Sequence, residues 1–178
     1  MSAEFSNKSK GEESNILLQL VTFHLGDEEF AVDILNIQGI NRMIEITKVP
    51  NSPDYVEGII CLRGKILPII DLRRRLGLPT KEYDKSTRFI VVEIENKIIG
   101  FIVDSVCEVL RINRNLTEPP PAIVAGIESD YITSVAKLED RLIILLDLNK
   151  VLTDNQKAEL VAFNVDNELN TSNKEQIM

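Results

Sequence analysis

Short apolar runs separated by turn-forming residues dominate the chain, and they predict β-strands. The first pair of runs covers residues 16–32 and is interrupted at Gly26-Asp27. The second covers residues 88–103 and is interrupted at Asn96-Lys97. A strand, a glycine- or asparagine-containing turn and a returning strand are typical of a β-hairpin. The pattern therefore predicts two hairpins of the same design, one in each half of the chain.

Four landmarks recur in the same order in the two halves. The first two matches have an offset of 71 residues and the last two an offset of 76 (33 to 104, and 71 to 147). The matched pairs are Phe30-Ala31-Val32-Asp33 with Phe101-Ile102-Val103-Asp104, Pro50 with Pro121, Ile69-Ile70-Asp71-Leu72 with Leu145-Leu146-Asp147-Leu148, and Leu76 with Leu152. All-β chains can reuse such patterns by chance, but ordered landmarks with one insertion of about five residues indicate an internal duplication.

Each copy has room for about five short strands. A sheet that small exposes unpaired edges, which closure into a barrel removes. We therefore expect an all-β protein of two small β-barrels packed side by side, over residues 16–84 and 85–152. Thr153 or Asp154 as N-cap predicts a short C-terminal helix over residues 153–163. The polar ends, residues 1–15 and 164–178, are expected to be disordered.

Charge and aromatic content narrow the class of partner. The formal net charge is −8, with 20 basic and 28 acidic residues, and the chain has three Tyr, six Phe and no Trp. An acidic surface with few aromatic rings is a poor match to a nucleic acid. The run Arg73-Arg74-Arg75 keeps a small β-barrel nucleic-acid-binding protein open as an alternative, because barrels of this size often take that role.

The chemistry-bearing residues do not form a catalytic pattern. No nucleophile elbow, phosphate-binding glycine loop or metal-ligand spacing is present. His24 is the single imidazole, so a small hydrolase built on surface carboxylates such as Asp71 lacks a plausible base. Cys61 and Cys107 lie in apolar stretches and are expected to be buried free thiols, with a disulfide as the alternative. We therefore predict no enzymatic activity, no metal and no cofactor.

Two further observations bear on location and on the strand ends. The N-terminal residues contain no apolar leader segment, and no run is long enough to span a bilayer, so we expect a cytoplasmic protein without membrane insertion. Asp residues recur where predicted strands end, at positions 33, 71, 104 and 147. Asp at such a position commonly accepts backbone N–H bonds of a turn or a helix start, which predicts a structural role.

Arg63 stands apart from the other charged residues. The segment Leu62-Arg63-Gly64-Lys65-Ile66 predicts a strand, a tight turn and a second strand, with Gly64 allowing a positive φ. A guanidinium on a rigid turn is either one more exposed cation or an anchor for a partner's carbonyls and carboxylates. Arg63, on this turn, is therefore the best candidate for a residue that binds a partner.

The sequence around Arg63 resembles the CheW family of chemotaxis adaptors. The fold of this family also forms the regulatory domain of the histidine kinase CheA. The resemblance covers about residues 16–160. Its most specific part is the LRG-x-I-x-P-I-x-D-L pattern at residues 62–72. Weaker matches are Phe30-Ala31-Val32-Asp33-Ile34, Gly58-Ile59-Ile60, Gly100-Phe101-Ile102-Val103-Asp104 and Leu145-Leu146-Asp147-Leu148.

The resemblance implies two five-stranded SH3-like barrels and a non-catalytic bridge between chemoreceptors and CheA. Such a protein is expected to be a monomer when free and to be recruited to membrane-associated receptor arrays. An adaptor of a related non-flagellar chemosensory pathway is the alternative within the family. A receiver domain, as in CheV, or kinase domains, as in CheA, do not fit the stretch of about 15 residues after Phe163.

The resemblance also implies site residues. In the groove between the barrels, the tip of a chemoreceptor's helical hairpin is expected to contact Ile37, Gln38, Gly58, Arg63 and Gly64. Contacts with the regulatory domain of CheA are expected in the second barrel, at Val103, Val106 and Val109. Two positions depart from the family pattern: Gly39 stands where a Glu is usual, and Cys61 where an Asn is usual.

Overall fold

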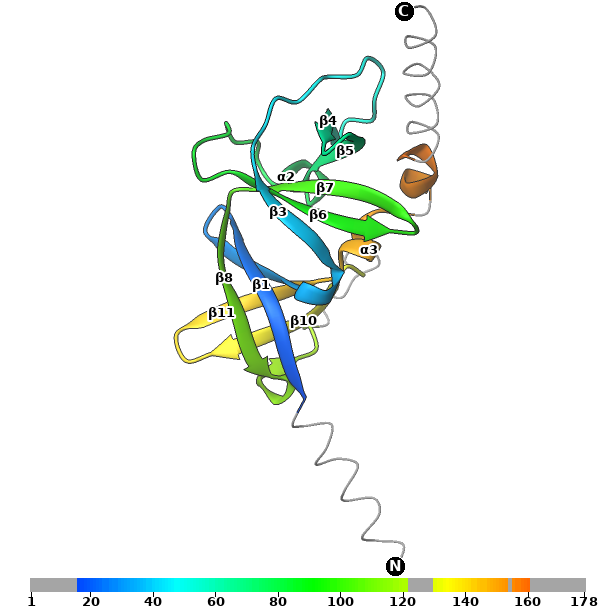
Figure 1. Ribbon diagram of the computed structural model, residues 1–178. Helices are drawn as coiled ribbons and strands as arrows, with labels where there is room; N and C mark the ends of the chain where they lie inside the picture. Colours follow the sequence, from blue (N-terminus) through cyan, green and yellow to red (C-terminus); the bar gives the residue numbers. More distant parts are fainter. Residues whose placement is uncertain (1–15, 122–129, 154, 161–178) are drawn as a thin grey trace, which may run out of the picture. The chain divides into compact units, whose positions relative to one another are not determined.

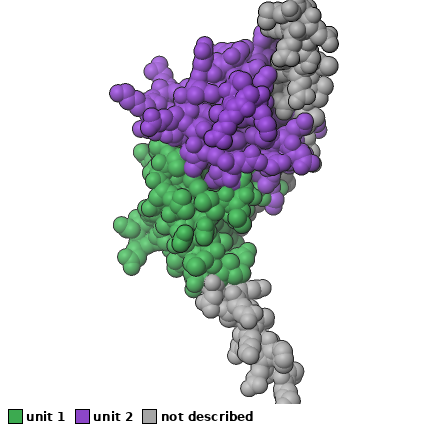
Figure 2. Space-filling model, in the orientation of Figure 1, with its two compact units in different colours: residues 1–36, 104–148 green, residues 37–103, 149–178 purple. Residues whose placement is uncertain are grey.

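A computed structural model describes residues 16–121, 130–153 and 155–160, and the chain divides into two compact units (Figure 2). Unit 1 comprises residues 1–36 and 104–148, and unit 2 comprises residues 37–103 and 149–178. Strands make up most of the described residues, and the helices are short (Figure 1). The predicted all-β class is confirmed.

Unit 1 contains a six-stranded sheet in the order β8-β1-β2-β11-β10-β9. Its strands are β1 (Leu17–Leu25), β2 (Glu28–Asp33), β8 (Ser105–Asn113), β9 (Thr117–Glu118), β10 (Ile132–Leu138) and β11 (Arg141–Leu146). Two short 3-10 helices, η1 (Ile34–Asn36) and η2 (Arg114–Leu116), follow β2 and β8. The predicted β1–β2 hairpin is present, and its turn begins at Gly26, whose φ of 64° is left-handed.

Unit 2 contains a five-stranded sheet in the order β3-β6-β7-β5-β4. Its strands are β3 (Ile37–Arg42), β4 (Val56–Leu62), β5 (Lys65–Asp71), β6 (Arg88–Ile94) and β7 (Lys97–Val103). The helix α2 (Leu72–Arg75) follows β5, and α3 (Leu148–Val151) begins where unit 1 ends. Residues 155–160 form a further helical segment.

Each sheet closes on itself by the same device. In unit 2 the chain that leaves the outer strand β3 returns to the opposite outer strand, where Thr47 pairs with Ile59 of β4. In unit 1 the chain that leaves β8 returns through η2 as β9, which pairs with β10 at Ala136–Thr117 and Val135–Glu118. Closure removes exposed strand edges, as expected for a small barrel.

The strands are not divided between the units at residue 84, where the sequence analysis placed the barrel boundary. Unit 1 joins β1 and β2 of the first copy to β8–β11 of the second, and unit 2 joins β3–β5 of the first copy to β6 and β7 of the second. When each strand of one copy is matched with its equivalent in the other copy, the order β8-β1-β2-β11-β10 in unit 1 corresponds strand for strand to the order β3-β6-β7-β5-β4 in unit 2. Equivalent strands of a duplicated chain present the same apolar faces, so the repeat alone does not reveal which copy supplies each partner.

Each unit has its own apolar core. In unit 1 the core cluster consists of Leu20, Ala31, Ile112, Ala136, Ile143 and Leu145. In unit 2 it consists of Ile60, Leu67, Ile69, Phe89, Val91 and Ile102. Gly100 of β7 lies directly against the second cluster, because a Cβ there would be 2.5 Å from Ile69 Cδ1.

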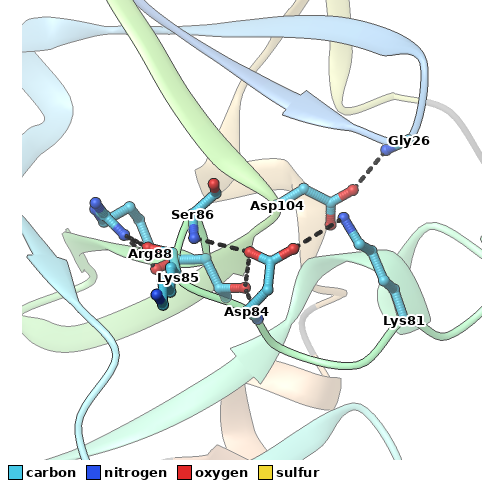
Figure 3. Close-up of polar contacts among 8 residues, drawn as sticks. Gly26, Lys81, Asp84, Lys85, Ser86, Arg88 and Asp104 are labelled. Atoms are coloured by element: carbon cyan, nitrogen blue, oxygen red, sulfur yellow. Dashed lines mark hydrogen bonds and ion pairs between the residues drawn. The ribbon is translucent and has the colours of Figure 1, made fainter.

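The predicted role of the strand-end aspartates is confirmed at three positions. Asp33 Oδ1 accepts a hydrogen bond from the Leu35 backbone N–H at 2.9 Å, and Asp71 Oδ1 accepts one from Arg73 at 3.0 Å, which caps α2. Asp104 Oδ2 accepts a bond of 2.7 Å from the Gly26 N–H (Figure 3). Carboxylates at these positions satisfy backbone donors that would otherwise lack partners.

The C-terminal helix begins with the predicted Thr153 cap. Thr153 Oγ1 accepts a bond of 3.2 Å from the Gln156 N–H, and Gln156 Oε1 accepts one of 2.9 Å from the Thr153 N–H. This reciprocal pair is a capping box. Leu160 is buried and Tyr55 donates to Glu159 at 2.9 Å, so the helix packs on unit 2. Residues 161–163 and the two polar ends lie outside the described residues.

Candidate partner-binding groove

The β4–β5 hairpin ends in a two-residue turn with left-handed backbone at both positions. Arg63 has a φ of 52° and Gly64 a φ of 80°. These angles are those of a type I′ turn, whose twist matches the flanking strands. For a residue with a side chain this conformation costs on the order of 1 kcal/mol, and such strain is concentrated at functional sites. The turn therefore fixes the backbone from which the exposed Arg63 side chain projects.

A cavity of about 260 Å³ opens beside this turn in unit 2. It is lined by Gln38, Gly39, Ile40 and Asn41 of β3, by Leu62, Arg63, Lys65 and Leu67 of the β4–β5 hairpin, and by Val91 and Ile98 of β6 and β7. Leu67 and Val91 are buried members of the unit 2 core, and Leu62 and Ile98 pack against that core. The floor is therefore apolar, while Arg63 and Lys65 add positive charge to the lining. We call this cavity the Arg63 groove.

A β-bulge shapes the other wall of the Arg63 groove. The register between β3 and β6 shifts between Ile37 and Gly39, which places Gln38 at the bulge. Gln38 Nε2 donates a hydrogen bond of 2.8 Å to Glu93 Oε2. Glu93 is exposed and lies two residues after Val91, on the same face of β6. Bulges commonly redirect a side chain next to a binding site.

The structure brings two of the five predicted receptor contacts into this groove. Gln38 and Arg63 line it. Gly64 completes the turn, and Ile37 is half-buried in β3, directly before Gln38. All four belong to unit 2.

Gly58 has a structural explanation that the sequence analysis did not anticipate. It is buried in β4, and a Cβ at this position would lie 2.3 Å from the Thr47 carbonyl oxygen and 2.7 Å from Ile46 Cγ2. The segment that closes the sheet therefore passes directly over Gly58, and its backbone bonds with Ile59 depend on that close approach. Because Gly58 is covered by its own chain, its predicted contact with a receptor is replaced by this packing role.

The three valines predicted to contact the kinase differ in exposure. Val103 is completely buried at the end of β7, so the structure assigns it to the core. Val106 is half-buried in β8, while Val109 of the same strand is 54% exposed. A register shift in the β1–β8 pairing leaves Val106 opposite Phe23 and Val109 opposite Val21, which places the two β8 valines on the same face of the strand. Of the three valines, Val109 alone presents most of its side chain to solvent.

Sequence reasoning missed most of the groove lining. Ile40, Lys65 and Leu67 lie close to predicted site residues along the chain, and their alternating pattern was an available signal. Val91 and Ile98 carried no such signal, because they belong to the second copy. Val91 reaches the groove through the β3–β6 pairing, and Ile98 of β7 reaches it through the β6–β7 pairing.

The Arg73-Arg74-Arg75 run is largely engaged in local structure. Arg74 pairs with Glu57 at 3.1 Å and with Asp71 at 3.8 Å. Arg73 Nη1 donates to the Pro79 carbonyl oxygen at 2.8 Å. Tyr83 donates to Asp71 at 3.2 Å, and burial together with the Asp71 charge raises the pKa of Tyr83. These contacts fix the end of β5 and offer little free charge to a phosphate backbone.

The cysteines are free, as predicted, but both are exposed and not buried. Cys107 Sγ lies 2.8 Å from His24 Nδ1. Cys107 is exposed as a residue, but partial desolvation of its thiol, with a smaller contribution from Glu29 and Glu108, raises the pKa of that thiol. The pair therefore does not provide an activated thiolate. Within residues 16–121, 130–153 and 155–160, no group of three or more His, Cys, Asp or Glu side chains forms a candidate metal site.

Comparison with known proteins agrees with this geometry. The CheW-like domain model matches residues 19–156. The chemotaxis protein CheW of Helicobacter pylori is 37% identical over 149 residues, covering 84% of this chain and 90% of that protein. The chemotaxis protein CheW of Klebsiella aerogenes is 34% identical over 140 residues, covering 79% and 84% of the two chains.

A solved structure shares the fold. The scaffolding protein TtCheW from Thermoanaerobacter tengcongensis is 38% identical, with a TM-score of 0.72 over 79% of this chain and 96% of that one. In the described part of this chain, no helix has the length and apolar character needed to cross a membrane. The chain therefore belongs to the CheW-like family and is an adaptor of chemotaxis signalling.

Proposed function

We propose that this chain couples chemoreceptors to the histidine kinase CheA in the cytoplasm, at membrane-associated receptor arrays, and that the Arg63 groove binds the receptor's hairpin tip. The observation that carries the proposal is a strained, exposed arginine beside an apolar cavity continuous with the unit 2 core. An apolar groove with a charged rim matches an amphipathic helix, which buries its apolar face and keeps its polar face exposed to solvent.

The size of the groove limits what enters it. A volume of about 260 Å³ is below that of most pockets that enclose a whole ligand. It fits one or two apolar side chains from successive turns of a helix. Gly39 adds to this fit, because β3 has no side chain there and the nearest atom to a Cβ would be Asn41 Nδ2 at 3.5 Å.

The charges around the groove favour one orientation of the helix. Arg63 and Lys65 belong to the β4–β5 hairpin, whereas the Gln38–Glu93 pair belongs to β3 and β6. A bound helix is therefore expected to place a carboxylate against the two cations and a donor, such as a lysine, against Glu93. Charge complementarity of this kind contributes mainly to specificity and to the rate of association.

A second surface is proposed for the regulatory domain of CheA, centred on Val109 and flanked by Val106. β8 is the first strand in the order of the unit 1 sheet, and Val109 is 54% exposed. Val106 and Val109 share one face of β8, and neighbouring apolar side chains of this kind are candidates for a protein interface. Because the two surfaces lie in different units, receptor and kinase are expected to bind at the same time.

The test is a pair of titrations of the isotope-labelled chain, one with a receptor hairpin fragment and one with the CheA regulatory domain. Arg63→Ala is expected to weaken receptor binding by about 1–3 kcal/mol, as is typical of an interface anchor, and to leave kinase binding unchanged. Arg114→Ala is the matched control, because Arg114 is an exposed arginine of unit 1. Equal receptor affinity of Arg63→Ala and the unaltered chain would remove Arg63 from the site.

The titrations also test the two-surface arrangement. Receptor hairpin and kinase domain are expected to shift separate sets of amide signals and to saturate together. If the two ligands compete for the same residues, the assignment of one surface to each unit fails. The proposal applies to a flagellar output and to a related non-flagellar pathway alike, because it concerns how this chain binds the receptor and not the output of the pathway.

A further inference from the structure

A second cavity in unit 2, outside the Arg63 groove, carries a concentration of positive charge. It has a volume of about 420 Å³ and lies where β3 ends and β6 begins. Its lining consists of Arg42, Met43, Asp84, Lys85, Thr87 and Arg88. Three cations and one carboxylate meet here in a chain whose formal net charge is −8. We call this cavity the β3–β6 cation pocket.

The single carboxylate of the pocket is already engaged. Asp84 Oδ1 accepts a bond of 2.8 Å from the Ser86 N–H and one of 3.4 Å from the Thr87 hydroxyl, and Lys81 Nζ lies 3.6 Å from Oδ2 (Figure 3). The Ser86 backbone bond is the main reason that the pKa of Asp84 is lowered. Asp84 therefore stays ionised and ties the loop together instead of neutralising the cations of the pocket.

The same loop holds Arg88 in place. Thr87 Oγ1 accepts a bond of 2.9 Å from the Asp84 N–H. Arg88 Nη1 donates to the carbonyl oxygens of Lys85 at 2.7 Å and Thr87 at 2.9 Å (Figure 3). These bonds use one nitrogen of the guanidinium and fix its plane. A guanidinium fixed in this way is prepared to bind a carboxylate with little further loss of side-chain entropy.

Arg42 increases the charge from the neighbouring strand. It lies directly opposite Arg88 in the β3–β6 register. Like charges directly opposite each other destabilise a sheet, so this pairing is unfavourable unless an anion lies between them. Within the described residues, none of Arg42, Lys85 and Arg88 forms an ion pair with a carboxylate.

We propose that the β3–β6 cation pocket binds an acidic segment of a protein partner, through two carboxylates that contact Arg42, Arg88 and Lys85. The volume is larger than one small oxyanion needs, and Met43 offers an apolar wall for the methylene groups of a glutamate side chain. Each guanidinium can bind one carboxylate in a bidentate manner. This site is separate from the Arg63 groove and does not depend on the receptor assignment.

The test uses the full isotope-labelled chain and a hexaglutamate peptide as the probe. The peptide is expected to shift the amide signals of Arg42 and of residues 84–88, with an affinity that falls as salt is added. Arg42→Gln is the main variant, because no loop bond depends on its side chain, and it is expected to weaken binding about tenfold. Arg88→Gln should weaken binding as well, but it also removes two bonds that hold the loop.

Arg111→Gln is the matched control, since Arg111 is an exposed arginine of β8 in unit 1. Its affinity for the peptide is expected to be unchanged. Shifts scattered over both units, or an equal loss in Arg111→Gln, would overturn the proposal by showing non-specific attraction. If inorganic phosphate at the same concentration displaces the peptide, the pocket is a small-anion site and the assignment to a protein segment is wrong.

Discussion

Units 1 and 2 share a strand order but differ in the turn that we propose as part of the receptor site. At an offset of 76 residues, Arg63-Gly64 of unit 2 corresponds to Glu139-Asp140 of unit 1. The unit 2 turn is cationic and left-handed at both residues. The unit 1 turn is acidic, and neither of its residues has a positive φ. One duplicated scaffold thus presents opposite charges at equivalent places, which allows each unit its own partner.

The duplicated geometry is kept at the C-terminal ends of β5 and β11. The Asp71 N–H donates to the Tyr55 carbonyl oxygen at 3.1 Å, and the Asp147 N–H donates to that of Tyr131 at 2.8 Å. Both pairs have the offset of 76 residues found for the later landmarks. Asp71 is the last residue of β5 and Asp147 directly follows β11, and each comes just before a short helix. The backbone of the scaffold is therefore common to both units, and the differences lie in the side chains of their turns.

The largest expected effect comes from dividing the chain at the boundary that the sequence suggested. A fragment of residues 1–84 contains β1–β5 but lacks β6, β7, β8 and β11, with which those strands pair. It is expected to show no cooperative unfolding transition. A fragment of residues 37–103 keeps all five strands of the unit 2 sheet and is expected to retain sheet structure by circular dichroism. Cooperative unfolding of residues 1–84 alone would contradict the observed strand exchange.

Gly58→Ala tests the close approach that closes the unit 2 sheet. The added methyl group would meet the Thr47 carbonyl oxygen at 2.3 Å, so the backbone must move, and we expect a loss of about 2–3 kcal/mol in the free energy of unfolding. Gly39→Ala is the control, with its nearest atom at 3.5 Å and an expected change below about 0.5 kcal/mol. Denaturant unfolding of both variants measures the difference. If Gly58→Ala is as stable as Gly39→Ala, the packing role of Gly58 is wrong and its predicted contact with a receptor becomes the better explanation.

Tyr83→Phe removes a hydrogen bond from the buried Asp71 and should cost about 1 kcal/mol. It should also change the response to alkali. Burial raises the pKa of Tyr83, so its contribution to stability is complete below about pH 10 and is lost as the unfolded chain ionises above that pH. Unfolding followed between pH 8 and 12 should give a shallower alkaline decline for the variant. An unchanged slope would show that Tyr83 ionises freely in the folded state.

The smallest effect is expected in unit 1, at Arg141→Gln. Arg141 pairs with Glu108 at 2.6 Å and with Glu29 at 3.7 Å, but the pair with Glu108 is largely solvent-exposed. Exposed pairs contribute about 0–1 kcal/mol, and salt screens them. Unfolding in low and high salt should therefore give a small difference between variant and unaltered chain that disappears in high salt. A difference of several kcal/mol would show that this cluster stabilises unit 1 as strongly as packing does.

Local features were predictable from the sequence, because neighbouring residues determine them. Both hairpins, the Arg63-Gly64 turn and the Thr153 cap follow from short-range rules about turns and caps. The partners of each strand were not predictable, since equivalent strands of the two copies are interchangeable in their apolar pattern. For the same reason only part of the Arg63 groove could be predicted from the sequence. Gln38 and Arg63 belong to the first copy, whereas Val91 and Ile98 belong to the second.

Burial explains the two site residues that the structure reassigns. Gly58 and Val103 stand in segments that match the family pattern, and pattern alone does not separate a contact from a core position. Gly58 is needed because another backbone segment crosses it, and Val103 is enclosed at the end of β7. Both residues are buried by segments that are distant in the chain, so sequence patterns among neighbouring residues do not predict their burial.

The interleaving of strands also sets the order in which the protein can mature on the ribosome. All five strands of the unit 2 sheet are synthesised once residue 103 is made, but unit 1 awaits β11, which ends at Leu146. The N-terminal hairpin ends at Asp33, 113 residues before Leu146, so at typical rates of about 5–20 residues per second it waits roughly 6–23 s with its apolar face uncovered. The segment translated first is thus among the last to be completed, and this interval is when we expect chaperones to engage the nascent chain.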